Sequence, residues 1–333
     1  MKLGIVGNGS IVQTALEHLQ EAHIEVTALW CRNEEKGRPL QQKYGFKLYT
    51  DYDAFLKDDS YDTIYIGLIN SLHYEYAMHA IEAGKHVIVE KPFTSRYGET
   101  LSLIEAAEEN HVLLFEAVVS RYSKNYDAIL PHLDDIGDLK MILANFSKTS
   151  SRYAAYEKGE VLPAFSLEAS GGALYDLNVY NIHFVTGIFG APSKVQYLAN
   201  KGFNGIDTSG VLTMEYGGFK CVCVASKDSG SPSHVILQGT KGYIEVPNPA
   251  SIVKNVTLHL NGSEEVKCLD VKDEGNVMTN EFLRIQEVVD GQDYNQAAIW
   301  LVRTKQVMAV LDQARVTAGI HFAADDDPEF TIL

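Results

Sequence analysis

The sequence predicts a two-domain α/β protein, with a doubly wound parallel sheet in residues 1–120 and an α+β domain in residues 121–333. The second domain is expected to contain a large open, mostly antiparallel sheet. Short apolar runs alternate with helix-like stretches in the first third of the chain, which is typical of βαβ units and a parallel sheet. Beyond about residue 120, β-rich segments are separated by glycine-containing turn pairs that favour antiparallel hairpins. The length of 333 residues is sufficient for two buried cores.

The first domain takes its strands from short apolar runs, which have the length of buried strands. These predicted strands lie within residues 2–7, 24–30, 62–68, 85–90 and 111–117. Amphipathic helices are expected between them, at residues 11–20, 72–83 and 96–110. Helices on both faces of a parallel sheet follow from this order of elements.

The second domain is expected to open with a helix near residues 122–134 and to continue with a sheet. Its β-rich segments are residues 138–149, 194–200, 208–216, 219–227, 233–239, 242–246 and 252–260. Helices are predicted at 171–190 and at 276–318, the latter broken around Gly291. The acidic segment 323–330 is expected to form a solvated turn before a last short strand.

Composition narrows the class of protein. The formal net charge of −16, without a cluster of Lys and Arg, argues against a nucleic-acid surface. No window has the length and hydropathy of a membrane span and no signal peptide is recognisable, so a cytoplasmic protein without membrane partners is expected. Cys221 and Cys223 stand two apart and are predicted to share one face of a strand as inert buried thiols. The histidines and cysteines lack metal-ligand spacing, so no metal is expected.

A glycine turn follows the first predicted strand. Gly7, Gly9, Ser10 and Ile11 lie at or directly before the start of the helix predicted at 11–20, and they are the candidate residues of a phosphate site. In a Rossmann turn, such glycines let the backbone approach a pyrophosphate that rests on the helix N-terminus. An ordinary tight turn is the alternative, but the position in a βαβ series favours dinucleotide binding. Val12 stands where a third small residue is usual, which predicts slightly wider helix–strand packing.

The end of the second strand bears on the choice between NAD and NADP. Cys31 and Arg32 stand where an acidic side chain would bind the ribose hydroxyls of NAD. No carboxylate at that place repels a 2′-phosphate, and Arg32 can offer a forked, permanently charged partner to one. NADP is therefore preferred over NAD, with stacking of Arg32 on adenine as the alternative.

The stretch 87–95, VIVEKPFTS, places Glu90, Lys91 and Pro92 at the end of a buried strand. Proline restricts the backbone of the residue before it, so Lys91 is expected in a fixed conformation. A solvated strand end is the alternative.

Polar residues recur every three or four positions in the predicted helix 171–190. Gly172, Asp176, Tyr180, His183 and Gly187 fall within a sector of about 60° at about 100° per residue. A polar sector flanked by glycines suits a cleft wall that admits a ligand closely. A solvent-facing side of a surface helix is the alternative.

Together these motifs resemble the Gfo/Idh/MocA family of NAD(P)-dependent oxidoreductases over essentially the whole chain, and most of all its dihydrodiol dehydrogenase-like and sugar-oxidoreductase members. Asn70 and His73 match a family segment near the nicotinamide ribose, and residues 90–92 match its EKP signature. Asp176 and Tyr180 match its D-x-x-x-H/Y helix, with tyrosine where many members carry histidine.

The resemblance implies hydride transfer between NAD(P) and a hydroxyl or carbonyl carbon of a sugar, polyol or diol. Lys91 and Tyr180 are the expected proton-transfer pair, with Asp176 orienting Lys91 or the substrate, and Glu90 is assigned to the cofactor site. The substrate cleft is expected to include three further side chains, those of Arg121, Tyr122 and His183. A non-catalytic dinucleotide-binding regulator of the same family is the alternative, and a scaffold role is a third option.

A homodimer or homotetramer is expected, built by stacking the open face of the second-domain sheet. One strand alternates two sets of side chains, which predicts one markedly apolar face. The two sets are Val211, Thr213 and Glu215, and Leu212, Met214 and Tyr216.

Overall fold

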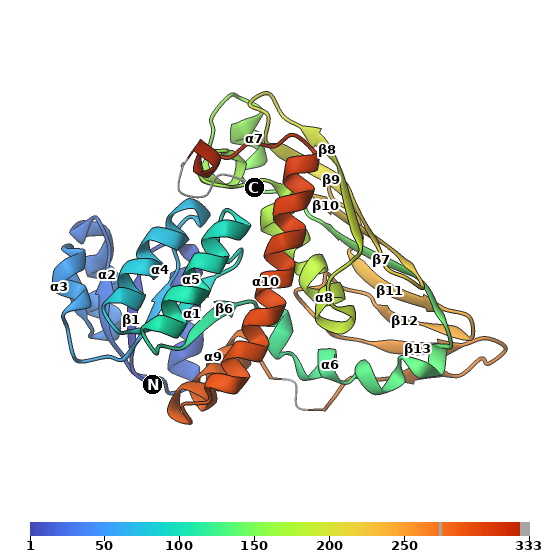
Figure 1. The fold of residues 1–333 in the computed structure, drawn as a ribbon, viewed down its shortest axis with the longest axis horizontal. Helices are drawn as coiled ribbons and strands as arrows, with labels where there is room; N and C mark the ends of the chain where they lie inside the picture. Colours follow the sequence, from blue (N-terminus) through green and yellow to red (C-terminus); the bar gives the residue numbers. More distant parts are fainter. Residues whose placement is uncertain (273–274, 327–333) are drawn as a thin grey trace. The chain divides into compact units, whose positions relative to one another are not determined.

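The computed structural model describes residues 1–272 and 275–326, and the chain divides into two compact units (Figure 1). Unit 1 comprises residues 1–117 and 278–305, and unit 2 comprises the other described residues. Sequence analysis had placed 278–305 in the second domain, because the βαβ pattern ends before them and nothing in their composition indicates a return to the first unit.

Unit 1 contains the predicted parallel sheet, with the strand order β3-β2-β1-β4-β5-β6. All neighbouring pairs are parallel. The strands are β1 (Leu3–Val6), β2 (Val26–Trp30), β3 (Lys47–Tyr49), β4 (Thr63–Ile66), β5 (His86–Glu90) and β6 (Leu114–Ala117). Reversal of the strand order next to β1 is the topological switch point at which doubly wound folds bind their ligands.

The helices of unit 1 include the three that the sequence predicts and others that it did not. The predicted ones are α1 (Ser10–Glu21), α4 (His73–Glu82) and α5 (Tyr97–Glu109). The others are α2 (Glu34–Tyr44), α3 (Tyr52–Leu56), α9 (Val277–Asp290) and the first part of α10 (Tyr294–Thr317). The break between α9 and α10 at Gly291 was predicted. The strongly polar α2 lacks an apolar stripe and is defined by its ends, where Asn33 accepts from the amide of Lys36 and Gly45 adopts a φ of 81°.

Unit 2 contains an eight-stranded, mostly antiparallel sheet, as predicted, with the order β14-β13-β12-β11-β7-β10-β9-β8. Only the pair β7–β10 is parallel among the neighbouring strands described. The strands are β7 (Leu139–Ser147), β8 (Lys194–Lys201), β9 (Asp207–Glu215), β10 (Lys220–Ser226), β11 (His234–Gly239), β12 (Gly242–Val246), β13 (Thr257–Leu260) and β14 (Val266–Cys268). In Figure 1, α8 (Val179–Phe189) lies against one face of this sheet.

Three local predictions for unit 2 are corrected. The helix expected at 122–134 is broken into α6 (Lys124–Asp127) and short 3-10 turns at Val119–Tyr122, Leu130–His132 and Asp134–Ile136, the second of which contains Pro131. The strand expected over 252–260 is reduced to β13, because Asn255 has a φ of 56° and its amide binds Asp270. The segment β14 was not predicted. Smaller helical pieces are α7 (Tyr153–Tyr156) and a 3-10 turn at Pro163–Phe165.

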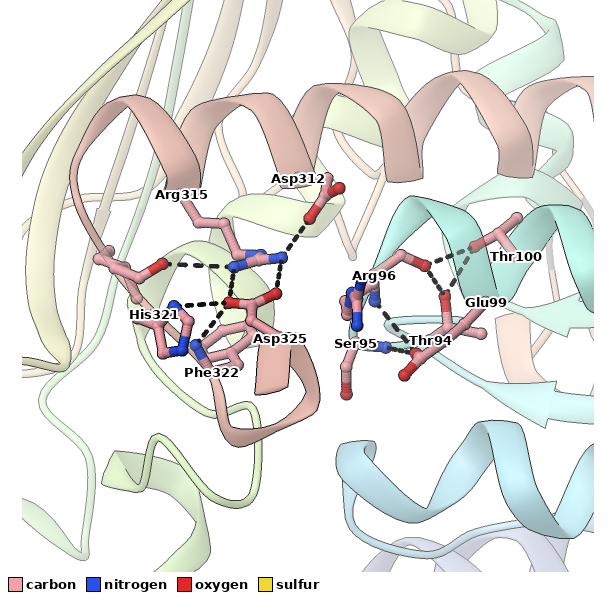
Figure 2. A network of polar contacts seen from close by, with 11 residues as sticks. Thr94, Ser95, Arg96, Glu99, Thr100, Asp312, Arg315, His321, Phe322 and Asp325 are labelled. Atoms are coloured by element: carbon pink, nitrogen blue, oxygen red, sulfur yellow. Dashed lines mark hydrogen bonds and ion pairs between the residues drawn. The ribbon is translucent and has the colours of Figure 1, made fainter. Parts of the chain in front are cut away.

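The end of the described chain is held by a buried arginine. Arg315 is 1% exposed and forms ion pairs with Asp312 and Asp325, as Figure 2 shows. Asp325 also accepts from the amide of Phe322, which leads into a 3-10 turn at Ala323–Asp326. The strand that was expected after this turn lies outside the described residues.

The apolar alternation of β9 is explained within the chain. Leu212 is fully buried, Met214 is 1% exposed and Tyr216 is 7% exposed, so this face belongs to the core of unit 2. Val211 and Thr213 point the other way and are partly exposed. The expectation that the more apolar face of this strand is the open one is therefore wrong, since α8 lies between that face and solvent (Figure 1).

Cys221 and Cys223 share one buried face of β10, as predicted, with their sulfur atoms 3.6 Å apart. Neither forms a disulfide. In the part of the chain that the structure describes, no helix is long and apolar enough to cross a membrane.

Candidate active site

The glycine turn has the geometry of an anion site. Gly7 has a φ of +112°, and a Cβ there would lie 2.6 Å from the carbonyl oxygen of Gly67, so only glycine fits. Gly9 precedes α1, and a Cβ there would meet no atom within 4 Å. Open space in front of the exposed amides at a helix N-terminus is what a pyrophosphate requires. The turn thus fits a dinucleotide phosphate.

Val12 is accommodated by a glycine on the neighbouring strand. Its side chain is fully buried, and a Cβ on Gly67 would lie 2.6 Å from Val12 Cγ2. The small residue that the motif usually carries on the helix is thus found directly after β4. The signal was present in the sequence as a glycine ending an apolar run, but its partner could not be identified without the register of the sheet.

Arg32 is exposed at the end of β2, and the residues on either side of it, Cys31 and Asn33, both form hydrogen bonds. The Cys31 thiol donates to the carbonyl of Asn33, and burial raises its pKa. The Asn33 side chain caps α2, with its Oδ1 accepting from the amide of Lys36. Arg38 pairs with Glu34 one helical turn away, at 2.7 Å. Arg32 is exposed where doubly wound folds place the residue that contacts the adenosine ribose.

Glu90 forms the fixed end of β5. It is buried, accepts from the Tyr65 hydroxyl at 2.6 Å, and accepts from the Lys91 amide at 3.2 Å. Burial raises the pKa of Glu90 despite these two donors and the Lys91 charge. The carboxyl group therefore fixes the backbone from which the Lys91 side chain extends.

His73 contacts the loop that follows β5. Its side chain is fully buried at the start of α4, with Nδ1 2.9 Å from the carbonyl oxygen of Pro92 and Nε2 3.3 Å from that of Leu68. Burial lowers its pKa, so the neutral ring is favoured. This placement makes His73 a brace for the Pro92 carbonyl, which directly follows the cis Lys91–Pro92 peptide. Asn70 opens the 3-10 turn Asn70–Leu72 just before it.

The residues after Pro92 are locked by buried polar contacts (Figure 2). One oxygen of Glu99 accepts from the amides of Ser95 and Arg96, at 2.9 and 3.1 Å. Thr94 donates to the Arg96 carbonyl at 2.8 Å and meets the Thr100 hydroxyl at 2.6 Å. Sequence reasoning missed this network. It leaves the chain after Lys91 with few alternative conformations.

In unit 2, Asp176 and Tyr180 lie on a helix that is not regular. Residues Leu174–Asn178 form a π-helical turn before α8. Because a π-helical turn is wider than an α-helical one, a helical wheel drawn at 100° per residue does not apply to it. His183 is buried, whereas Asp176 and Tyr180 are partly exposed. The predicted single polar sector is therefore wrong in its extent. π-Turns are frequent at functional sites, because they re-aim side chains.

The start of this helix is fixed by Asp207 on β9. Its fully buried carboxylate accepts from the Leu174 amide at 2.6 Å and from the Tyr197 hydroxyl at 2.8 Å, while burial raises its pKa. Gly172 has a φ of +98°, and a Cβ there would lie 2.0 Å from Asp207 Oδ1. Glycine at position 172 is thus needed to bring the carboxylate onto the helix N-terminus.

One residue of the site was missed altogether. Lys227 directly follows β10, and its ammonium lies 2.8 Å from Asp176 Oδ2. A lone lysine after a strand carries no sequence signal, and only the sheet topology places it beside the helix.

The three expected substrate residues belong to unit 2 and differ in exposure. Arg121 is partly exposed, whereas Tyr122 and His183 are buried. Burial of His183 fits a supporting role better than contact with a substrate. The ring of Tyr180 lies 5.9 Å from that of Phe146. Among the residues that the structure describes, no group of His, Cys, Asp or Glu is arranged to hold a metal.

Comparison with known proteins identifies the class. Residues 1–118 match the model of an oxidoreductase family with an NAD-binding Rossmann fold, and residues 134–245 match the GFO/IDH/MocA C-terminal domain. The chain is 31% identical over 268 residues to a trans-1,2-dihydrobenzene-1,2-diol dehydrogenase of Xenopus tropicalis, covering 76% of this chain and 78% of the relative. It is 29% identical to the scyllo-inositol 2-dehydrogenase (NADP(+)) IolU of Bacillus subtilis, covering 98% and 99% of the two chains.

Solved structures agree on the fold. The 3-ketoreductase KijD10 from Actinomadura kijaniata, in complex with NADP, superposes with a TM-score of 0.81 at 20% identity, covering 95% of this chain and 97% of that one. The WlbA dehydrogenase from Bordetella pertussis gives a TM-score of 0.77 at 16% identity, covering 96% of each. The glycine turn and the two domains thus define an NAD(P)-binding oxidoreductase. The chain belongs to the Gfo/Idh/MocA family.

Proposed function

We propose that this protein transfers a hydride between NADP and the hydroxyl- or carbonyl-bearing carbon of a sugar, polyol or diol. The observation that carries the proposal is the fixed placement of Lys91. Glu90 and His73 hold the backbone on either side of it, which is more than a solvated strand end needs. A positive charge on a rigid backbone suits proton transfer in which the charge must stay beside one oxygen atom.

In this proposal, the nicotinamide supplies or accepts the hydride when it is bound. For oxidation, Tyr180 takes the proton from the substrate hydroxyl as the C–H bond gives up its hydride. Tyrosine ordinarily titrates near pH 10, so it needs a neighbouring cation to act near neutrality. Lys91 provides that charge. Asp176 accepts a hydrogen bond that orients the substrate or Lys91.

NADP is the cofactor that the residues of unit 1 favour. The N-terminus of α1 and the open space at Gly9 accept the pyrophosphate, and exposed Arg32 binds the 2′-phosphate. The names of IolU and of the KijD10 complex, which both mention NADP, support this preference without deciding it. NAD remains the competing cofactor.

The substrate class follows from the relatives. Their names specify scyllo-inositol and a trans-dihydrobenzenediol, both ring compounds with neighbouring hydroxyl groups. Partly exposed Arg121 and Asp176 offer charged hydrogen-bond partners to such hydroxyls. We therefore infer an oxidoreductase that acts on CH–OH groups.

A substrate screen tests the proposal. Purified protein is incubated with NADP⁺ or NAD⁺ and with scyllo-inositol, myo-inositol, aldoses or trans-1,2-dihydrobenzene-1,2-diol, and the absorbance of the reduced cofactor is followed. Turnover with at least one of these compounds, faster with NADP⁺, is expected. Tight NADPH binding without turnover of any compound, in either direction, would favour the non-catalytic regulator instead.

The open face of the unit 2 sheet is the proposed contact between copies of this chain. Its outward rows place Leu198 beside Val211, and Leu143 between Val222 and Ile236. Leu198 is 62% exposed and its partner Val211 is partly exposed, so this face presents adjacent apolar side chains that a second copy would cover. A homodimer in light scattering at micromolar concentration is expected, and Leu198→Glu should produce monomers. A wild-type monomer under those conditions would contradict the proposal.

A further inference from the structure

Lys227 is a buried lysine at the end of a central strand. Its side chain is 2% exposed. Its own amide donates to the Thr208 carbonyl and its carbonyl accepts from the Ser150 amide, both at 2.8 Å, so the backbone is held from two sides. An ammonium that is removed from water requires partners that replace its hydration.

Two of its partners are structural groups of the loop before the helix. The ammonium donates to the carbonyl oxygen of Ala164 at 2.6 Å and lies 4.7 Å from the centroid of the Phe165 ring. A cation over an aromatic face is favourable when it is desolvated. These contacts explain how the lysine is tolerated inside unit 2.

The third partner differs in kind, because it is the carboxylate of Asp176. Oδ2 lies 2.8 Å from the ammonium, and the Asp176 side chain is 38% exposed. The ion pair therefore joins a lysine that water does not reach to a carboxylate that a ligand can reach. Because Lys227 has a fixed backbone and a confined side chain, it limits the orientations that the carboxylate can adopt.

A second carboxylate nearby is already engaged. Asp207 is fully buried and is bound by the Leu174 amide and the Tyr197 hydroxyl. The charge of Lys227 acts on Asp207 as well, against the effect of burial on its pKa. The direct ion pair of the lysine is nevertheless with Asp176.

We infer that Lys227 is a positioning residue of the reaction: through its ion pair with Oδ2 it holds the Asp176 carboxylate in the orientation that contacts the substrate. The inference rests on the proposed function, in which Asp176 orients the substrate or Lys91. The π-helical turn contributes by placing Asp176 where Lys227 can reach it.

Lys85 shows what a purely structural buried lysine looks like in the same chain. Its ammonium donates to the carbonyls of Asp58 and Tyr61, at 2.9 and 3.0 Å, and lies 4.7 Å from the centroid of the Tyr61 ring. Carbonyls and an aromatic ring thus satisfy a buried lysine. Lys227 adds a carboxylate of the proposed site to that environment, and Lys85 provides a matched control.

The test is a double-mutant cycle in kcat with NADP⁺ and the fastest compound among scyllo-inositol, aldoses and trans-1,2-dihydrobenzene-1,2-diol. Lys227→Met should lower kcat by about 10- to 100-fold, because a misplaced orienting group costs about that much. The Kd for NADPH, measured by fluorescence, should stay within about twofold of wild type, because the residues proposed to bind its pyrophosphate and 2′-phosphate belong to unit 1. Lys85→Met should leave kcat within about twofold, while its thermal midpoint falls by an amount similar to that of Lys227→Met.

Asp176→Asn completes the cycle. In that background, Lys227→Met should change kcat by less than about threefold, because the lysine acts through the carboxylate that has been removed. An equal loss in both backgrounds would overturn the inference, since it would reveal a general structural effect. If Lys227→Met precipitates, Lys227→Gln retains a donor for the Ala164 carbonyl without the charge and is held to the same criteria.

The cycle separates failure of the inference from failure of the proposed function. Impairment in Asp176→Asn together with full activity in Lys227→Met would overturn the inference alone. Full activity in Asp176→Asn would remove the proposed role of Asp176, and the inference would fall with it.

Discussion

The candidate residues of unit 1 and those of unit 2 are held in place in different ways. Around Lys91, two of the groups that fix the backbone are close in sequence, since Glu90 precedes it and Glu99 binds the amides of the loop that follows, and His73 on α4 adds a third contact. Around Asp176, the fixing groups come from distant strands, since Asp207 lies on β9 and Lys227 follows β10. A residue that is held by its neighbours in the sequence can be recognised from a short motif. A residue that is held by distant strands of a sheet cannot be recognised in this way.

The largest expected effect concerns Lys91 of unit 1 and Tyr180 of unit 2, the two side chains that the proposed proton transfer requires. Tyr180→Phe should lower kcat by about 10²–10⁴, the range for loss of a general acid–base group, with NADPH affinity near wild type. Lys91→Met should do likewise. The double variant should lose much less than the product of the two losses, because residues that act as one unit are strongly non-additive. Steady-state kinetics with a proven substrate would measure this.

Tyr216→Phe is the matched control for the phenol. Its hydroxyl donates to the Gly190 carbonyl just after α8, so the change removes a buried hydroxyl from the same unit without touching the proposed site. It should leave kcat nearly unchanged. Full activity in Lys91→Met would return Lys91 to the simpler interpretation of a solvated strand end.

The next effect tests how the sheet holds the helix in unit 2. Gly172→Ala should destabilise the protein by about 3 kcal/mol or more, because it combines a strained φ with a clash against Asp207. Gly159 has a φ of +90° with no atom within 4 Å of a Cβ, so Gly159→Ala isolates the strain at about 1–2 kcal/mol. Urea unfolding of both variants measures the difference. Equal losses would show that Asp207 can move aside at little cost.

The sequence predicted what local periodicity and motifs encode. Both sheets, the glycine turn and the pairing of Cys221 with Cys223 on one face were predicted because strands repeat every two residues and glycine turns are short-range features. The polar sector predicted for the helix that carries Asp176 and Tyr180 was wrong in its extent. The prediction assumed 3.6 residues per turn throughout, and the sequence pattern does not reveal the π-turn. Lys227 was missed for the same reason that Gly67 was: each is defined by a neighbour that only the strand order provides.

Cofactor choice is proposed to depend on unit 1, whose candidate residues can be recognised from short motifs. It should therefore respond to a single substitution. Arg32→Ala should raise the KM for NADP⁺ by about 10- to 100-fold, equivalent to about 1.5–3 kcal/mol of charge-assisted hydrogen bonding. The KM for NAD⁺ should change little. Arg38→Ala removes a nearby charge that is already paired with Glu34, and it should affect both cofactors slightly and equally. If Arg32→Ala moves both constants together, Arg32 stacks on adenine instead.

The smallest expected effect concerns the contact between Gly67, directly after β4, and Val12 on α1. The question is whether a substitution at one position compensates for a substitution at the other. Gly67→Ala should destabilise unit 1 by about 1–3 kcal/mol, because the new methyl group would lie 2.6 Å from Val12 Cγ2 in a tightly packed core. Val12→Ala should cost about 1–2 kcal/mol by leaving a cavity. The double variant should be more stable than the sum of the two losses predicts, because the alanine on α1 vacates the space that the methyl group enters. Chemical unfolding of the four proteins measures this coupling. Simple additivity would mean that α1 shifts away from β4 to accept the methyl group, which is the wider packing that the sequence first suggested.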